Sequence, residues 1–354
     1  MGADSVEVLD CASGRSLART RLPAPLAAPV AADFARGALY VATRTPELLR
    51  YSLPGLSLQA RTPLQFEPTA LAVPSDPDAV VLAGGAGRVP LVAHDPNTLA
   101  VMLAYRLEQA STVSAIVDVA GRRRMVVGFA DRSELWEIAY GRDAPPVLRG
   151  LVHDYRSKEA VPLPGRLTER AFEVANGTRA LVAAASSFEV LRIDELGAPG
   201  VVNLDVRREI DRPAVPGGVQ APLAVAWRAA GARGWVIARA DGTAYRLQAP
   251  SWKLSVHALG GPVLALAATS DAGRLLGLIE VPGAHVERGP GAASGGSAVM
   301  VVTVRVDARD WEVEPQARLE LQPRTIARVA AGSQGGCTAA LDAAGRWLAR
   351  LAPR

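Results

Sequence analysis

The chain has 354 residues, of which 49% are hydrophobic and 21% charged, so it has ample apolar material for a compact core and not the composition of a disordered protein. Its formal net charge of +4 comes from arginines interspersed with acidic residues, which does not indicate nucleic-acid binding. No apolar run approaches the ~20 residues that a membrane span needs, and the sequence shows no signal-peptide pattern. Only two cysteines, Cys11 and Cys337, are present, which excludes a disulfide framework and a cysteine-rich zinc site.

A repeated unit of short apolar strands joined by polar turns runs along the chain. In the first clear copy, Val30–Phe34 is followed by predicted strands at Leu39–Ala42, Leu48–Leu53 and Leu56–Thr62. The copies start at Val30, Thr69, Thr112, Ala171, Leu223, Val263 and Thr325. Their spacing, mostly roughly 40 to 60 residues, suits four short strands per copy and is too short for units that contain helices.

The alternation of apolar and polar residues, without a long helical period, predicts an all-β fold. We expect one β-propeller domain over residues 1–354, built from four-stranded blades with a WD40-like repeat, of which seven are countable. Two segments break the repeat and are expected to be loop insertions, Arg142–Arg170 and Gly283–Ser297.

The two ends of the chain are expected to close the ring together. Val6–Asp10 and Ser16–Leu22 resemble the outer strands of a blade without inner strands, and Thr325–Leu341 supplies inner strands. Pairing them removes an exposed edge, so we predict that Val6–Asp10 pairs with strands from Thr325–Leu351. This closure would also bring Cys11 near Cys337.

The most distinctive string for chemistry is Gly150–Arg156, which contains His153, Asp154 and Tyr155. A histidine beside an aspartate and a tyrosine would orient a ligand or move protons near neutral pH. The alternative, which we favour over catalysis, is a loop whose polar side chains bond to nearby backbone groups. The other histidines are scattered, and no cluster has metal-ligand spacing, so no metal site is predicted.

Five motifs stand out along the chain: Ile116–Arg123, Glu134–Ile138, Ala144–Pro146, Gly150–Tyr155 and Val201–Arg208 followed by Pro216-Gly217. Together they resemble the haem d1 propellers, which are the d1 domain of cytochrome cd nitrite reductases and the NirF-type proteins of haem d1 biosynthesis. The resemblance implies an eight-bladed ring, a periplasmic location and a tetrapyrrole held over the central opening.

The same resemblance implies histidines at positions where this chain has other residues. These positions read Leu26-Ala27-Ala28-Pro29, Gly218-Val219-Gln220 and Arg239-Ala240-Asp241. A haem iron is normally held by such side chains. His153 and Tyr155 are then the candidate cofactor-binding residues, and Arg44, Arg132 and Arg239 would pair with tetrapyrrole carboxylates.

Three functions fit these observations. The first is a non-catalytic accessory or scaffold protein of haem d1 maturation or denitrification, which binds haem d1 weakly or not at all and works with a tetrapyrrole or a partner protein of that pathway. The second is a haem d1-dependent oxidoreductase of the nitrite reductase or dihydro-haem d1 dehydrogenase kind. The third is a protein-interaction propeller without a cofactor. We favour the first and third, because a fold alone does not establish catalysis.

Overall fold

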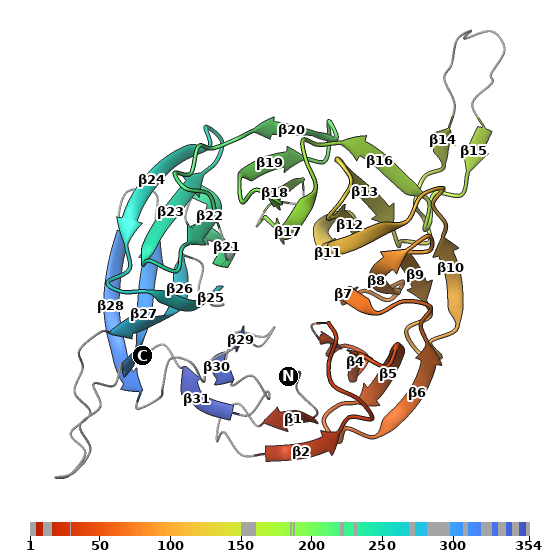
Figure 1. Cartoon of the computed structure of the whole chain (residues 1–354), viewed down its shortest axis with the longest axis horizontal. Coiled ribbons are helices and arrows are strands. Elements are labelled where there is room, and N and C mark those ends of the chain that lie inside the picture. Colours follow the sequence, from red (N-terminus) through yellow and green to blue (C-terminus); the bar gives the residue numbers. More distant parts are fainter. Residues whose placement is uncertain are drawn as a thin grey trace, which may run out of the picture.

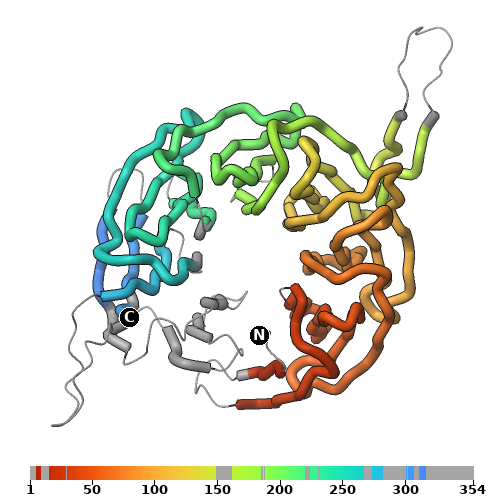
Figure 2. The backbone as a smooth tube through the Cα atoms, viewed as in Figure 1, coloured from red at the N-terminus to blue at the C-terminus, as the bar shows by residue number. Residues whose placement is uncertain are grey.

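The computed structural model is a ring of antiparallel sheets whose first strands face the centre and whose last strands form the rim (Figure 1). Figure 2 follows the described backbone around this ring, from the red first blade to the blue sixth. The structure describes all residues except 1–4, 10–15, 29, 150–160, 185, 187, 220–222, 230–231, 269–272, 282–297, 307–310, 320–327, 332–337, 342–346 and 352–354.

Six complete blades are present within these described residues. Blade 1 contains β3 (Ala31–Asp33), β4 (Ala38–Thr43), β5 (Glu47–Ser52) and β6 (Leu58–Pro63). Blade 2 contains β7 (Pro68–Ala72), β8 (Val81–Gly87), β9 (Leu91–His94) and β10 (Val101–Tyr105). Blade 3 contains β11 (Ser111–Val119), β12 (Arg124–Phe129), β13 (Glu134–Ala139) and β16 (Glu169–Glu173).

The remaining complete blades follow the same order. Blade 4 contains β17 (Thr178–Ala183), β18 (Glu189–Asp194), β19 (Pro199–Asn203) and β20 (Arg208–Asp211). Blade 5 contains β21 (Leu223–Ala229), β22 (Ala232–Ala238), β23 (Thr243–Gln248) and β24 (Lys253–Ala258). Blade 6 contains β25 (Val263–Ala268), β26 (Arg274–Val281), β27 (Ala298–Val306) and β28 (Trp311–Leu319).

Two partial sheets occupy the arc between blades 6 and 1 (Figure 1). One is the hairpin of β1 (Ser5–Leu9) and β2 (Ser16–Arg21), and the other contains β29 (Arg328–Ala331), β30 (Thr338–Leu341) and β31 (Trp347–Leu351). The hairpin packs on blade 1 and β29 lies against β25, an arrangement compatible with one closing blade. Hydrogen bonding between the two parts stays a prediction, and both cysteines lie outside the described residues.

One predicted repeat start is wrong. Ala171 does not begin a blade but lies in β16, the fourth strand of blade 3, opposite Trp136 of β13. The first strand of blade 4 begins later, at Thr178. The cause is the excursion between β13 and β16, which contains β14 (Val147–Arg149) and β15 (Val161–Leu163) and separates β16 in sequence from its own blade.

The hydrophobic core lies mainly between neighbouring blades. Clusters of buried side chains join blades 1 and 2, 2 and 3, 3 and 4, 4 and 5, and 5 and 6. In the seam between blades 2 and 3, for example, Phe129 contacts Trp136 edge to face with ring centroids 4.8 Å apart, and the Tyr105 hydroxyl donates to the Leu167 carbonyl at 2.7 Å. The only described helical element is a 3-10 turn, Ala120–Arg122, so no helix of this part of the chain is long enough to cross a membrane.

Candidate functional site

The propeller presents two faces that carry different turns. In a blade of antiparallel strands, the turn between the second and third strands lies on the same side as the connection to the next blade. The turns between the first and second strands and between the third and fourth strands lie on the other side. We call these sides the 2–3 face and the 1–2 face.

The three arginines predicted to bind a cofactor all lie on the 2–3 face. Arg44, Arg132 and Arg239 follow the second strands of blades 1, 3 and 5. The positions where the sequence resemblance implies histidines are on this face as well. The segment at Leu26 pairs with Thr43 beside Arg44, and the connection at Gly218 leads into blade 5. The fold therefore brings these sequence-distant positions to one side of the ring.

Two of the three arginines are held by neighbouring groups. The Arg132 Nε atom donates to Glu134 Oε1 at 2.7 Å, and the Arg239 Nη1 atom donates to the Pro216 carbonyl at 2.7 Å. Arg44 has an exposed side chain, and its backbone amide donates to the Pro25 carbonyl at 2.8 Å. Of the three, Arg44 is therefore the guanidinium that is most accessible to a ligand carboxylate.

The other two predicted site residues, His153 and Tyr155, lie outside the described residues. The strands that flank them, β14 and β15, extend from the rim of the ring (Figure 1). Their excursion connects the third and fourth strands of blade 3, so it leaves the ring on the 1–2 face. The flanking strands do not join the arginines on the 2–3 face.

Two of the four histidines, His94 and His257, are described, and both are engaged within the fold. The His94 ring is buried, its Nδ1 atom lies 3.0 Å from the Leu99 carbonyl, and burial lowers its pKa. His257 stacks on Trp311 with centroids 4.4 Å apart, and burial also lowers its pKa. No group of three or more metal-ligating side chains comes together in the described part of the chain.

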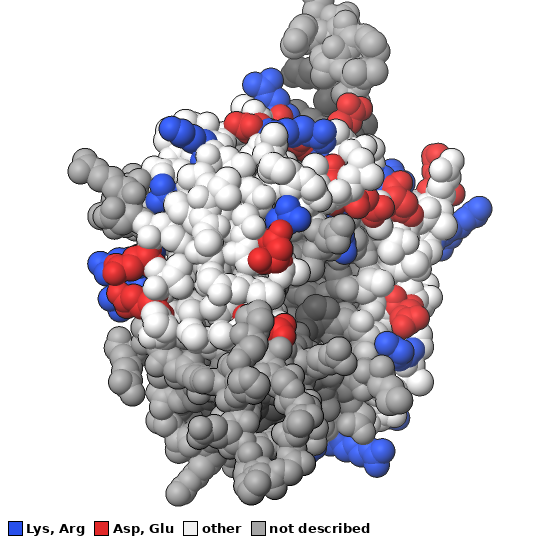
Figure 3. Space-filling view, turned by 60° about the vertical axis from the view of Figure 1, so that its left-hand side comes forward, with Lys and Arg blue, Asp and Glu red and all other residues white. Residues whose placement is uncertain are grey.

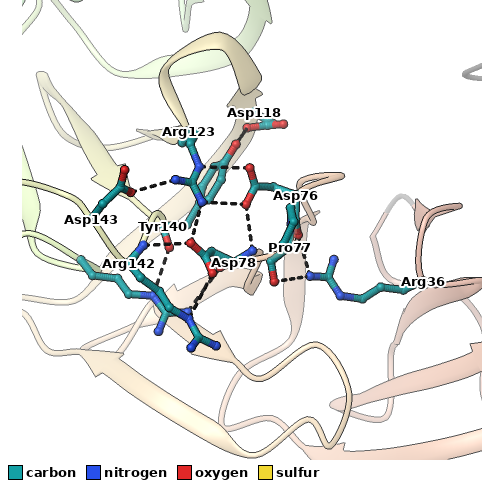
Figure 4. A network of polar contacts seen from close by, with 10 residues as sticks. Arg36, Asp76, Pro77, Asp78, Asp118, Arg123, Tyr140, Arg142 and Asp143 are labelled. Carbon is teal, nitrogen blue, oxygen red and sulfur yellow. Dashed lines mark hydrogen bonds and ion pairs between the residues drawn. The ribbon is translucent and has the colours of Figure 1, made fainter.

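A polar network on the 1–2 face was not predicted from the sequence. Arg123 donates from Nε and Nη2 to the two carboxylate oxygens of Asp76 at 3.0 Å each, and from Nη2 to Asp78 Oδ2 at 2.6 Å (Figure 4). Its Nη1 atom donates to Asp143 at 2.8 Å. Arg36 of blade 1 donates to the backbone carbonyl of Asp76 at 2.5 Å. The network therefore ties together the turns of blades 1, 2 and 3.

Asp118 and Tyr140 form the inner end of this network (Figure 4). The Tyr140 hydroxyl donates to Asp118 Oδ1 at 3.1 Å. Burial raises the pKa of Asp118 to about 6, and the charge of Asp76 acts in the same direction. Asp118 is thus a carboxyl group that exchanges its proton close to neutral pH, a property found at functional sites. An acidic residue inside the apolar inner strand β11 was the available sequence signal.

The surface carries charges of both signs. On the side drawn in Figure 3, arginine and lysine side chains lie among aspartate and glutamate side chains. Among the described residues on that side, the basic side chains form no continuous area.

Comparison with known proteins supports the fold and not a particular activity. No protein-family model matches the chain, and no curated protein matches it. Among solved structures, it is similar to the dihydro-heme d1 dehydrogenase NirN in complex with DHE, with a TM-score of 0.71 and 18% identity over 99% of this chain and 71% of that chain. Kuenenia stuttgartiensis hydrazine synthase matches with a TM-score of 0.58 and 11% identity over 93% of this chain and 95% of that chain.

The likeness to NirN, together with the ring of antiparallel sheets, confirms the fold class predicted from the sequence, an all-β propeller. At this level of identity it shows the fold alone. Activity has to be argued from the side chains of this chain.

Proposed function

We propose that this protein is a divergent haem d1-type propeller that acts as a non-catalytic accessory or scaffold protein in haem d1 maturation or denitrification, in the periplasm. The observation that carries the proposal is the match of 99% of the chain to a propeller whose structure was determined with DHE bound. The ligand side would be the 2–3 face, where Arg44, Arg132 and Arg239 lie.

Weak, non-catalytic binding fits the side chains on that face. Leu26 and Gly218 stand where the resemblance implies histidines, and Arg239 is bonded to the Pro216 carbonyl and lies 3.3 Å from Asp241 Oδ2. Arg44 is left to pair with a tetrapyrrole carboxylate. A single exposed guanidinium contributes little, about 1 kcal/mol or less, because solvent screens the pair.

The test is a spectroscopic titration of the whole protein with haem d1. We expect weak binding without the low-spin spectrum of a histidine-ligated haem, a further loss of affinity in Arg44→Gln and little change in His153→Ala. Arg61→Gln on the outer strand β6 is the matched control, because Arg61 is exposed on the rim. A tight complex whose spectrum collapses in His153→Ala would overturn the proposal and favour the oxidoreductase.

One observation favours the protein-interaction propeller as a second candidate. The outer strand β10 exposes Val101, Met102 and Leu103 at 58%, 39% and 37%, and it carries no charged residue. Charged residues normally protect such strand edges from pairing with other chains. Two results together would favour this function. Titration with haem d1 would cause no spectral change, and a protein of the haem d1 pathway would be retained by the wild-type chain but not by Leu103→Lys.

A further inference from the structure

The seam between blades 3 and 4 contains a buried carboxylate surrounded by arginines. Glu137, on β13, has a side chain with 0% exposure. Arg124 Nη1 lies 2.7 Å from Glu137 Oε2, Arg207 Nε lies 3.3 Å from the same oxygen, and Arg122 Nε lies 3.4 Å from Oε1. A fourth arginine, Arg170, is the direct cross-strand neighbour of Glu137 on β16. We call this group, together with Asp205, the basic seam.

Positive charge exceeds negative charge in the basic seam. Asp205 bonds to Arg122 and is the second carboxylate of the group. Four guanidiniums and two carboxylates leave a net charge of +2. Burial lowers the pKa of Arg170, and the positive charges of Arg124 and Arg207 act in the same direction. Partly buried charge without a counter-ion is costly, so an anion that pairs with these arginines would stabilise the seam.

Arg170 meets no carboxylate oxygen within ion-pair distance among the residues that the structure describes. Its Nη2 atom donates to the Pro146 carbonyl over 3.5 Å, at the limit of a hydrogen bond. Glu169 is adjacent in sequence, but successive residues of a strand point to opposite faces. Consistent with this, burial raises the pKa of Tyr105 in blade 2, and the negative charge of Glu169 raises it further. Phe172, which shares a strand face with Arg170, packs instead in the seam with blade 4.

An open groove of about 610 Å³ lies beside Arg170 and Arg207. Its other walls are Pro146, Val147 and Leu148 at the base of the β14–β15 excursion, with Ala171 and Glu169 from β16. The volume lies within the roughly 300–1,000 Å³ range of small-molecule sites. Leu148 is 67% exposed, which leaves an apolar surface next to the two guanidiniums.

We infer that this groove binds a small organic dianion, a dicarboxylate with an apolar body. Its carboxylates pair with Arg170 and Arg207, each of which presents a planar donor pair that matches a carboxylate. Arg170 and Arg207 present one positive charge to each carboxylate, and the apolar body covers Leu148 and Val147. Inorganic phosphate supplies the charge but not the apolar contact. The groove lies at the rim near the 1–2 face and is separate from the 2–3 face proposed for a tetrapyrrole.

The test compares phthalate with inorganic phosphate at equal ionic strength, by calorimetric titration of the whole protein. We expect saturable binding of phthalate at one site, with phosphate at least tenfold weaker. Arg170→Gln should weaken phthalate binding at least tenfold. Because this change removes repulsion between arginines and leaves the contacts of Glu137 with Arg124 in place, the unfolding midpoint should not fall. Arg61→Gln is the control and should bind as the wild type does.

Two outcomes would overturn the inference. One is phosphate binding as tightly as phthalate, which would show that the apolar wall contributes nothing. The other is unchanged phthalate affinity in both Arg170→Gln and Arg207→Gln. Titration of Arg170→Gln with haem d1 separates this site from the proposed function, since tetrapyrrole binding on the 2–3 face should be the same as in the wild type.

Discussion

Replacement of Asp118 by asparagine should stabilise the protein at neutral pH. Burial raises the pKa of this carboxyl from 3.8 to about 6, so at pH 7.5 the folded state holds a charge that it accommodates poorly. The difference corresponds to about 3 kcal/mol at 1.36 kcal/mol for each tenfold change. Because Asp118 is only half-buried, we reduce the expected gain to about 1–2 kcal/mol. The amide oxygen of Asp118→Asn can still accept the Tyr140 hydroxyl.

The pH dependence gives the sharper test of the same reasoning. Between pH 6 and about 4, the folded wild type takes up a proton at Asp118 that the unfolded chain does not yet bind, so its stability rises relative to Asp118→Asn. The advantage of the variant should therefore shrink as the pH falls through 6 and vanish near 4.

Urea unfolding followed by tryptophan fluorescence, at pH 7.5, 6.0 and 4.5, measures this difference. Asp143→Asn serves as the control, since its side chain is 81% exposed and its single ion pair with Arg123 contributes little. A variant that is less stable than the wild type at pH 7.5, or an advantage that does not depend on pH, would refute the reasoning.

Two further predictions concern the seams and a buried histidine. In Gly128→Ala the new Cβ would lie 2.6 Å from Thr178 Cγ2, across the seam between blades 3 and 4. The free energy of unfolding, measured in urea, should therefore fall by about 1–3 kcal/mol. Gly55→Ala is the control: its new Cβ would meet no atom within 4 Å, so the free energy of unfolding should change by less than about 1 kcal/mol. Burial lowers the pKa of His94 below its usual 6.5, so its contribution to stability is fully present above pH 6.5 and falls below that pH, where the histidine of the unfolded chain takes up a proton. In the Asp118→Asn background, the variant His94→Gln should therefore lose less stability between pH 7.5 and 5.5 than the chain that keeps His94. An equal loss in both would contradict this prediction.

Much of the propeller could be predicted because its signals are local. The repeat starts at Val30, Thr69 and Leu223 lie within one residue of the observed first strands β3, β7 and β21. The strands at Val30 and Thr69 are followed by turns that contain Arg36-Gly37 and Asp76-Pro77-Asp78, which are residue types typical of turns. Ala171 was assigned wrongly because pairing of β16 with β13 is a long-range contact across the excursion, and sequence proximity carries no information about it.

The candidate sites were harder to predict than the fold. Arg44, Arg132 and Arg239 each follow the second strand of a blade, so their common face can be deduced once the strands are assigned to blades. The pairs of Arg123 with Asp76 and of Arg207 with Glu137 join different blades. The two residues of these pairs are 47 and 70 positions apart in the sequence. Whether they meet depends on the angle and offset between neighbouring blades, and a repeat pattern in the sequence does not specify these.

The position of the hydrophobic clusters between blades has a consequence for how the molecule folds. A single blade encloses little core of its own, since side chains such as Phe129 and Trp235 are covered only when the neighbouring sheet is in place. Folding of each blade is therefore coupled to that of its neighbours, as in linear repeat proteins, but here the coupling runs around a ring. A fragment cut at a blade boundary would present half of a core to water, and it would be expected to associate with other fragments rather than persist as a smaller folded unit.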